Sequence, residues 1–409
     1  MPKSRSPIIS KIIKVFLWIL VIFLSFELFL FFITPIYDFP QPTIFSGNKL
    51  YNPYRGMDNS QWKKANFHFH TRAWGGLTNG RKNSNEAFWD TYKKLGYDVP
   101  CVSNYQNIST FNQDSAFYIP VYEHGFGIWK KHQLCIGARK VSWIDFSIYQ
   151  NLNTRQFMLN ILHDQNEAVA IAHPDWENGY PLDVLKYLSN YDLIEALDQN
   201  WRSIPQWDAA LSSGHPVFIV ADDDAHDIYN IYKVGICCTF INSKTNHAAD
   251  ILHALKEGNA FGADIFMYNK EGFDKKAERA KHIPKLNSVK LDHDTLRVAV
   301  STKTMKIAFI GQNGKIMKTV DGDSTAFYKF MPEDTYIRTV ITFLNDMKGR
   351  GTRFYLNPVF RYSGERPVNS LKAEINQTKT WLLRLFTIPV LFVLLGLFVY
   401  SQMRHKSGV

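Results

Sequence analysis

The sequence predicts an α/β protein that contains a barrel, with a small antiparallel β domain after it and a transmembrane helix near each end. Residues 66–260 alternate short apolar runs with helical patterns, which is typical of parallel βαβ units. From about residue 285 the pattern changes to single apolar residues alternating with polar ones. Two long apolar stretches lie at residues 12–33 and 381–400.

Each apolar stretch is long enough to cross a bilayer as a helix, which takes about 20 residues. A cleaved signal peptide is the alternative for the first stretch, but the apolar run is long and no small-residue cleavage site follows it. Basic residues lie on the terminal side of both stretches: Lys3, Arg5, Lys11, Lys14, Arg404 and Lys406. Because positive flanks stay in the cytoplasm, we expect cytoplasmic tails at 1–11 and 401–409 and an extracytoplasmic body, periplasmic or on the outer face.

One acidic residue, Glu27, lies inside the first stretch, and we expect it at a helix–helix contact. The net charge is +10, but apart from the residues that flank the two apolar stretches the basic residues are scattered and form no dense basic helix. No nucleic-acid binding is therefore expected. The four cysteines each lie in an apolar run and form no CxxC pair, which predicts small buried side chains. Vicinal Cys237 and Cys238 point to opposite faces of a strand and are not expected to pair.

Seven apolar runs predict the barrel strands, at 66–70, 98–103, 133–137, 168–172, 193–197, 217–221 and 235–241. Helical patterns between them cover 85–95, 154–165, a segment from Pro181, a segment from Pro205 to before Gly214, and 247–257. For the first helix, Asn83 and Glu86 fit a capping box and Gly96 a stop.

The predicted β domain covers residues 283–366. Leu296, Val298 and Val300 alternate with polar residues, and Asn313-Gly314 and Asp321-Gly322 are tight-turn signals. Because no helical pattern is found there, we expect an antiparallel sandwich.

His68 and His70 are the most informative residues. Two histidines two apart on a strand point the same way, and neutral imidazoles bind transition metals. Further candidate ligands follow short apolar runs: Glu123, His132, His173, Asp224 and His226. This pattern predicts a metal centre at strand ends; the alternatives are ordinary strand histidines, a strand end at His173 and a solvated acidic loop at 222–224.

The order and spacing of these motifs, together with the run 98–105, resemble the PHP (polymerase and histidinol phosphatase) family. The resemblance implies a distorted seven-stranded (β/α) barrel over residues 60–275, with up to three metals at the strand ends and cleavage of phosphate esters. It also implies metal ligands at His68, His70, Glu123, His132, His173, Asp224 and His226, with Glu123 bridging two metals.

The sequence departs from that family's Thr-Asp-His motif, because Ser103, Asn104 and Tyr105 stand there. Their oxygens are weaker ligands for borderline cations, so we expect two divalent ions of Mn, Zn or Fe, or one, and not three. Tyr105 is expected to form a pocket wall. Asp192 and Glu195 are candidates to orient a ligand imidazole.

The expected reaction is phosphoester hydrolysis by metal-activated water at Glu123 and Asp224, with Arg72 neutralising a substrate phosphate. Lys130, Lys131 and Arg202 are further candidates for that last role. Other polar residues are expected on the surface or in packing, namely His124, His163, His215, His247, His253 and the solvated Asp208.

We therefore expect a membrane-anchored, extracytoplasmic phosphatase or phosphodiesterase acting on a phosphorylated small molecule, lipid or polymer. Two alternatives stay open: a degenerate barrel that acts as a binding or scaffold protein of the cell envelope, which the Asn104 and Tyr105 substitutions motivate, and an interaction protein that works through the β domain. Metal-dependent hydrolysis of another bond type is a further possibility. The sequence identifies neither the substrate nor the oligomeric state.

Overall fold

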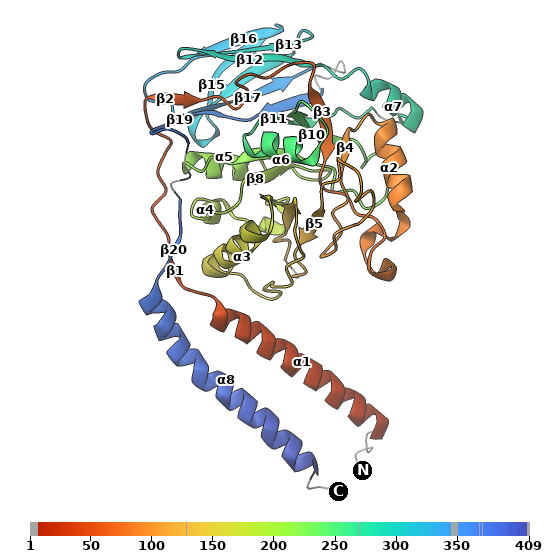
Figure 1. The fold of residues 1–409 in the computed structure, drawn as a ribbon, viewed down its shortest axis with the longest axis vertical. Coiled ribbons are helices and arrows are strands. Elements are labelled where there is room, and N and C mark those ends of the chain that lie inside the picture. The colour runs from red at the N-terminus through yellow and green to blue at the C-terminus, as the bar shows by residue number, and fades with distance from the viewer. Residues whose placement is uncertain are drawn as a thin grey trace.

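The computed structural model describes residues 7–127, 129–268, 270–344, 351–367, 369 and 371–406. It is a mixed α/β protein in which two long helices leave the same side of a globular part (Figure 1). Lys3, Arg5 and residues 407–409 of the predicted tails lie outside the described residues, as do the side chains of Arg404 and Lys406.

The two terminal helices are α1 (Pro7–Ile33) and α8 (Gln377–Lys406). Within them, Lys11–Ile33 and Gln377–Leu397 are long and apolar enough to cross a membrane, with mean hydropathies of 2.7 and 2.0. The helices contact each other and place both chain ends at the same far end of the molecule (Figure 1). A short antiparallel pair, β1 (Tyr37–Asp38) with β20 (Glu374–Ile375), joins them to the body. The side of the membrane stays a prediction.

Seven short strands surround the candidate site, in two groups. β3 (Trp62–Asn66) and β4 (Val99–Pro100) are parallel. The other group is a five-stranded sheet, in order β5 (Val121–His124), β6 (Gln133–Ile136), β7 (Ala168–Ile171), β8 (Leu193–Leu197) and β9 (Phe218–Ala221). β6 is antiparallel to both of its neighbours, whereas β7, β8 and β9 are parallel.

The two groups of strands are joined at each end by a single isolated β-bridge. One bridge pairs Tyr105 with Glu123, and the other pairs Phe69 with Ala225. The prediction of parallel βαβ units is therefore wrong for β6. The distorted seven-stranded barrel stays a prediction, because the described residues do not form a closed seven-stranded ladder. Both bridges adjoin residues of the candidate site, since Phe69 lies between His68 and His70 and Tyr105 pairs with Glu123.

The predicted strand list needs three corrections. The predicted strand 66–70 overlaps β3 only at Asn66, so His68 and His70 lie in the segment after the strand and not on it. β5 was not predicted, because its four residues include Glu123 and His124 and do not form an apolar run. The predicted strand 235–241 is β10 (Cys237–Asn242). It is not one of the seven strands around the site, and it is antiparallel to β3 and to β11 (Ala260–Asp264). β10 reads as a barrel strand because most of it is buried.

The predicted helices are all present with small shifts. They are α2 (Asn85–Lys94), α3 (Leu152–Gln165), α4 (Leu182–Leu185), α5 (Ile204–Ser212) and α6 (Ala248–Lys256). The N-cap of α2 is Ser84, whose side chain accepts from Ala87 N, and not the predicted Asn83. Asn83 instead bonds the backbone of His70 and Ile228, which fixes the loop after β3. α7 (Phe273–Ala280) was not predicted.

The C-terminal region is antiparallel, as predicted. β12 (Leu286–Asp292), β13 (Thr295–Val300) and β16 (Thr325–Lys329) form one sheet. The second sheet contains β15 (Ile316–Asp321), β14 (Lys306–Ile310), β17 (Tyr336–Thr342) and β18 (Arg353–Leu356) and continues through β11 and β10 to β3 and β4. β19 (Val359–Tyr362) joins β17 to β2 (Lys49–Tyr51). The two sheets share a core, and the domain boundaries stay predictions.

An ion pair ties this region to the α/β part. Asp208 on α5 accepts two bonds of 2.7 Å from Arg338 on β17, and both residues are buried. The prediction that Asp208 is solvated is therefore wrong. The four cysteines are buried and free, as expected.

Candidate metal centre

The polar residues of the site come from one end of the strands. His68 and His70 follow β3, Glu123 is on β5, and His132 immediately precedes β6. His173 and Asp224 follow β7 and β9. Because β6 runs opposite to β5 and β7, its first residue lies at the same end as their last ones. Sequence positions more than 150 residues apart therefore meet in one buried place.

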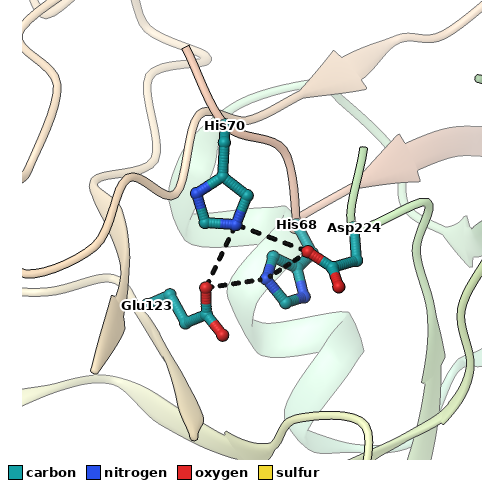
Figure 2. Close-up of side chains that lie close together, drawn as sticks. All are labelled: His68, His70, Glu123 and Asp224. Atoms are coloured by element: carbon teal, nitrogen blue, oxygen red, sulfur yellow. Dashed lines mark ion pairs between the residues drawn. The ribbon is translucent and has the colours of Figure 1, made fainter. Parts of the chain in front are cut away.

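The first group of possible ligands is His68, His70, Glu123 and Asp224, whose side chains point toward one another (Figure 2). Glu123 Oε2 lies 3.2 Å from His68 Nε2 and 3.0 Å from His70 Nε2. Asp224 Oδ1 lies 3.2 Å and 3.4 Å from the same two nitrogens. Two imidazoles and two carboxylates thus face a common centre.

The second group uses the other oxygen of the same carboxylate. Glu123 Oε1 lies 2.5 Å from His132 Nδ1 and 3.2 Å from His173 Nε2. In each group the possible ligand atoms lie within 4.8 Å of one another. Glu123 is therefore placed to bridge two neighbouring centres, one per oxygen.

Buried atoms without partners test whether a cation fits. His68 Nε2, His70 Nε2, Glu123 Oε2 and Asp224 Oδ1 lie 3.0–3.4 Å from one another as ion pairs, but none of them makes a hydrogen bond of acceptable geometry within the described part of the chain. Buried polar atoms in folded proteins are normally paired, because leaving one unpaired costs about 1–3 kcal/mol. Nitrogen and carboxylate ligands in this arrangement suit a divalent transition metal. The cluster therefore indicates divalent metal binding.

The charges of the cluster are tightly linked. Burial lowers the pKa of His68, but Asp224, Glu195 and Glu123 outweigh it and raise that pKa well above its usual value. Burial raises the pKa of Glu123, but His132 and His68 outweigh it and hold that pKa well below its usual value. The pKa of Asp224 is likewise lowered against burial by His68 and His70. The carboxylates stay ionised, as ligands must be.

Glu195 orients the ligand side chains from behind. Its Oε1 lies 2.9 Å from His68 Nδ1, and its Oε2 accepts from His173 N at 2.8 Å. This fixes the His68 ring with Nε2 toward the cluster. Asp192, the other candidate for this role, accepts from Val169 N and does not contact a ligand imidazole.

Backbone strain accompanies the site. His173 and Asp224 have φ values of 27° and 45°, in the region that residues with a Cβ rarely adopt. Gly125 has φ 125°, and a Cβ there would lie 2.5 Å from His132 Cδ2. Gly125 was not among the predicted site residues, although its place two residues after Glu123 and shortly before His132 was the available signal.

Ser103, Asn104 and Tyr105 have different surroundings: the first two bond the backbone of a loop, and the third faces the candidate site. Ser103 Oγ accepts from Phe69 N, and Asn104 bonds Thr71 with both ends of its amide. These two residues fix the loop after β3, so Asn104 has no free oxygen for a metal. Tyr105 alone faces the site: its ring stacks on His70 with centroids 4.4 Å apart, and its hydroxyl lies 3.4 Å from His226 Nε2.

His226 lies at the rim and not inside either group. Its ring stacks on His70 with centroids 4.2 Å apart, and its Nδ1 lies 3.7 Å from Asp224 Oδ1. Burial and the nearby His70 lower its pKa to about 4. The ring is therefore neutral near pH 7, and its role as a ligand stays a prediction.

The predicted phosphate-binding cations are less well placed. Arg202 is held by Asp264 through bonds of 3.0 and 2.8 Å, so it is committed to the fold. Arg72 is exposed and outside both groups. Lys130 stands over the Trp176 ring, which lies 5.0 Å from the His173 ring, so contacts link it to the site through Trp176. Lys131 is half-buried beside Asp145.

One buried acid beside the cluster was missed. Asp198 follows β8, as Asp224 follows β9, and its Oδ2 has no partner among the described residues. Burial, with Glu195 and Asp224 nearby, raises its pKa to about 7. Its place after an apolar run was the available signal.

Comparisons with known proteins give one distant similarity. No family model matches the chain, and no curated protein matches it. A solved structure from Bacteroides vulgatus, of a two-domain protein containing a predicted PHP-like metal-dependent phosphoesterase, is 11% identical and has a TM-score of 0.37. The match covers 78% of this chain and 99% of that one. A similarity of this size establishes neither fold nor function.

Proposed function

We propose that this protein is a metal-dependent phosphoesterase held on the extracytoplasmic face of a membrane. The observation that carries the proposal is Glu123, whose two oxygens each face a separate pair of histidines while both groups remain buried. His68, His70 and Asp224 would hold one ion, and His132 and His173 the other. Two such ions supply an activated water and neutralise the charge on a phosphoryl group.

The residues of this chain set up that chemistry. Glu195 holds the His68 ring, and Glu123 fixes the separation of the two groups. Tyr105 and His226 form one wall, where a neutral imidazole and a phenol are available as hydrogen-bonding groups for a substrate oxygen. Lys130 lies on the side of His173, where an anionic substrate would approach. The ligand chemistry favours Mn, Zn or Fe.

The test uses the full chain in nanodiscs, loaded with Mn, Zn or Fe, and measures phosphatase and phosphodiesterase activity. Wild-type protein is expected to hydrolyse at least one ester class, and His70→Ala or Asp224→Ala is expected to abolish this. Asp192→Asn is the matched control, since Asp192 is a half-buried carboxylate next to β8 that contacts none of the possible metal ligands. Full activity in His70→Ala would remove the mechanism. A metal-free and inactive wild-type protein would favour the scaffold alternative.

A further inference from the structure

The end of α1 packs directly against the body next to the site. Ser147 N donates to Glu27 Oε1 at 3.1 Å, and the Phe31 ring contacts Phe146 at a centroid distance of 5.2 Å. Leu30, Phe146 and Met158 form a small buried core of their own. Glu27 therefore contacts a loop of the body, whereas its position in the sequence predicted a helix–helix contact.

The contact between Glu27 and Ser147 determines where the loop 144–149 lies relative to a membrane that α1 would cross. Glu27 precedes Ile33, where the apolar stretch ends, by six residues, or about 9 Å along a helix axis. If α1 crosses a bilayer, residues 144–149 lie at the membrane surface or below it. α3 and its neighbouring loops indeed lie at the end of the globular part from which α1 and α8 extend (Figure 1).

Two loops at this end expose large aromatic side chains. We call residues 125–127, 129–131 and 139–150 the rim loops. They are joined by Asp145, which accepts from Phe126 N and Gly127 N, and by Trp129 Nε1, which donates to Ile148 O. Trp129, Trp143 and Tyr149 are 50%, 57% and 59% exposed. Exposed Trp and Tyr beside an apolar helix are typical of a membrane interface.

The charge of the rim loops fits an anionic lipid surface. They contain four basic residues, Lys130, Lys131, Arg139 and Lys140, and one acidic residue, Asp145. Asp145 is buried and its oxygens are occupied by hydrogen bonds, and Arg139 is paired with Glu167 at 3.7 Å. Lys130, Lys131 and Lys140 therefore leave the rim loops with a positive charge. Basic residues near a membrane surface are attracted to anionic lipids.

The rim loops also border the candidate metal centre. The Trp143 and Trp74 rings meet at a centroid distance of 5.8 Å, and Trp74 Nε1 donates to Tyr105 O at 2.8 Å. Tyr105 stacks on His70. Three contacts thus lead from an exposed rim residue to a possible metal ligand.

We propose that the rim loops rest on the anionic surface of the membrane that holds α1 and α8, and that the substrate is a phosphate ester on a lipid of that surface. The second half rests on the proposed function. A lipid phosphate at the rim loops would then lie close to the site, since Trp143, Trp74 and Tyr105 link those loops to His70. The proposal holds whichever side of the membrane the body occupies.

The contact is tested by accessibility in nanodiscs of anionic phospholipid. A fluorescent thiol label is placed on full-length Tyr149→Cys and, as a matched control, on Phe327→Cys; Phe327 is 51% exposed on β16, at the far end of the body (Figure 1). The native cysteines are buried. The label at position 149 is expected to be quenched by nitroxide-bearing lipids and shielded from aqueous iodide, and the label at 327 the reverse.

Equal iodide quenching at both positions would overturn the contact. Shielding from iodide without quenching by lipid would also overturn it, since a protein would then cover the loops. The substrate half is tested by hydrolysis of phosphatidic acid in the nanodisc against soluble p-nitrophenyl phosphate. Tyr149→Ser is expected to lower the ratio of these two rates several-fold, and Phe327→Ser to leave it unchanged.

The failures can be told apart. Lipid quenching at position 149 without hydrolysis of either substrate would contradict the proposed function and support the contact. Hydrolysis of the soluble ester alone would support the proposed function and overturn the lipid substrate.

Discussion

Asp223 and Asp224 are neighbours in the chain and both are buried, yet their surroundings differ completely. Asp223 accepts four hydrogen bonds, from Tyr92 and the backbone of Gly235, Ile236 and Cys237. Asp224 Oδ1 has no partner in the described part of the chain and faces two histidines. A buried carboxylate with all its bonds made holds a fold together, whereas one left open among imidazoles indicates a ligand.

The largest expected effect comes from removing the open carboxylate. Asp224→Ala should lower the rate of hydrolysis by more than about 100-fold, because a metal ligand is lost. This is more than the loss typical of a residue that only holds a ligand in place. The thermal unfolding midpoint of Asp224→Ala in chelator should change much less than that of Asp223→Ala, since Asp224 Oδ1 makes ion-pair contacts with two histidines but no hydrogen bond. Activity and unfolding are measured on the same preparation. A large loss of stability with activity retained would reverse the comparison.

Asp223→Ala should do the opposite. Losing a charged acceptor of four bonds leaves several buried donors unpaired, which should lower the free energy of unfolding by about 3 kcal/mol. Metal bound per folded molecule should be unchanged. Urea unfolding and elemental analysis check this. Wild-type stability in Asp223→Ala would mean that satisfied bonds are not what holds β10 to β9.

Glu195 combines features of Asp223 and Asp224, because its oxygens have hydrogen-bond partners and these partners belong to the possible metal ligands His68 and His173. Glu195→Gln keeps the shape but weakens the bond to His68, so metal affinity or activity should fall by about 10–100-fold. Asp192→Asn, three residues earlier in the chain, should change neither. Metal titration of both variants measures the difference. Equal behaviour of the two variants would show that Glu195 does not orient His68.

The smallest effect is a graded dependence on pH. Despite burial, the carboxylates raise the pKa of His68, His70 and His173 in the metal-free protein. A metal binds only the neutral imidazole. Protons therefore compete with the metal for these rings already at pH values above the usual pKa of histidine, and metal affinity should fall steadily as the pH is lowered. Calorimetry in buffers of different ionisation enthalpy should show proton release on metal binding near pH 7. Binding without proton release would contradict these pKa directions.

The sequence predicted the parts of the site that sit in short, recognisable motifs. His68, His70, Glu123, His132, His173 and Asp224 do meet, because each adjoins a strand and the strands share one end. Their metal-binding role stays a prediction. The candidate membrane spans were visible for a similar reason, since an uninterrupted apolar run of about 20 residues is itself a strong local signal.

What the sequence did not show depends on tertiary contacts. β5 is too short and too polar to resemble a strand, and β10 resembles a barrel strand only because other sheets bury it. The opposite roles of Asp223 and Asp224 have no signal in three consecutive aspartates. Glu27 also looked like a contact within the membrane until its partner, Ser147, was seen.

The central claim is that two groups of ligands share Glu123 around bound metal. The most direct measurement is elemental analysis of the purified full chain, wild type against Glu123→Ala, after equilibration with Mn, Zn or Fe and removal of excess ion. The account predicts two equivalents of one of these metals in wild type, and their loss in the variant while Asp192→Asn retains them. A folded wild-type protein that binds none of these metals, or a Glu123→Ala protein that keeps both equivalents, would contradict it.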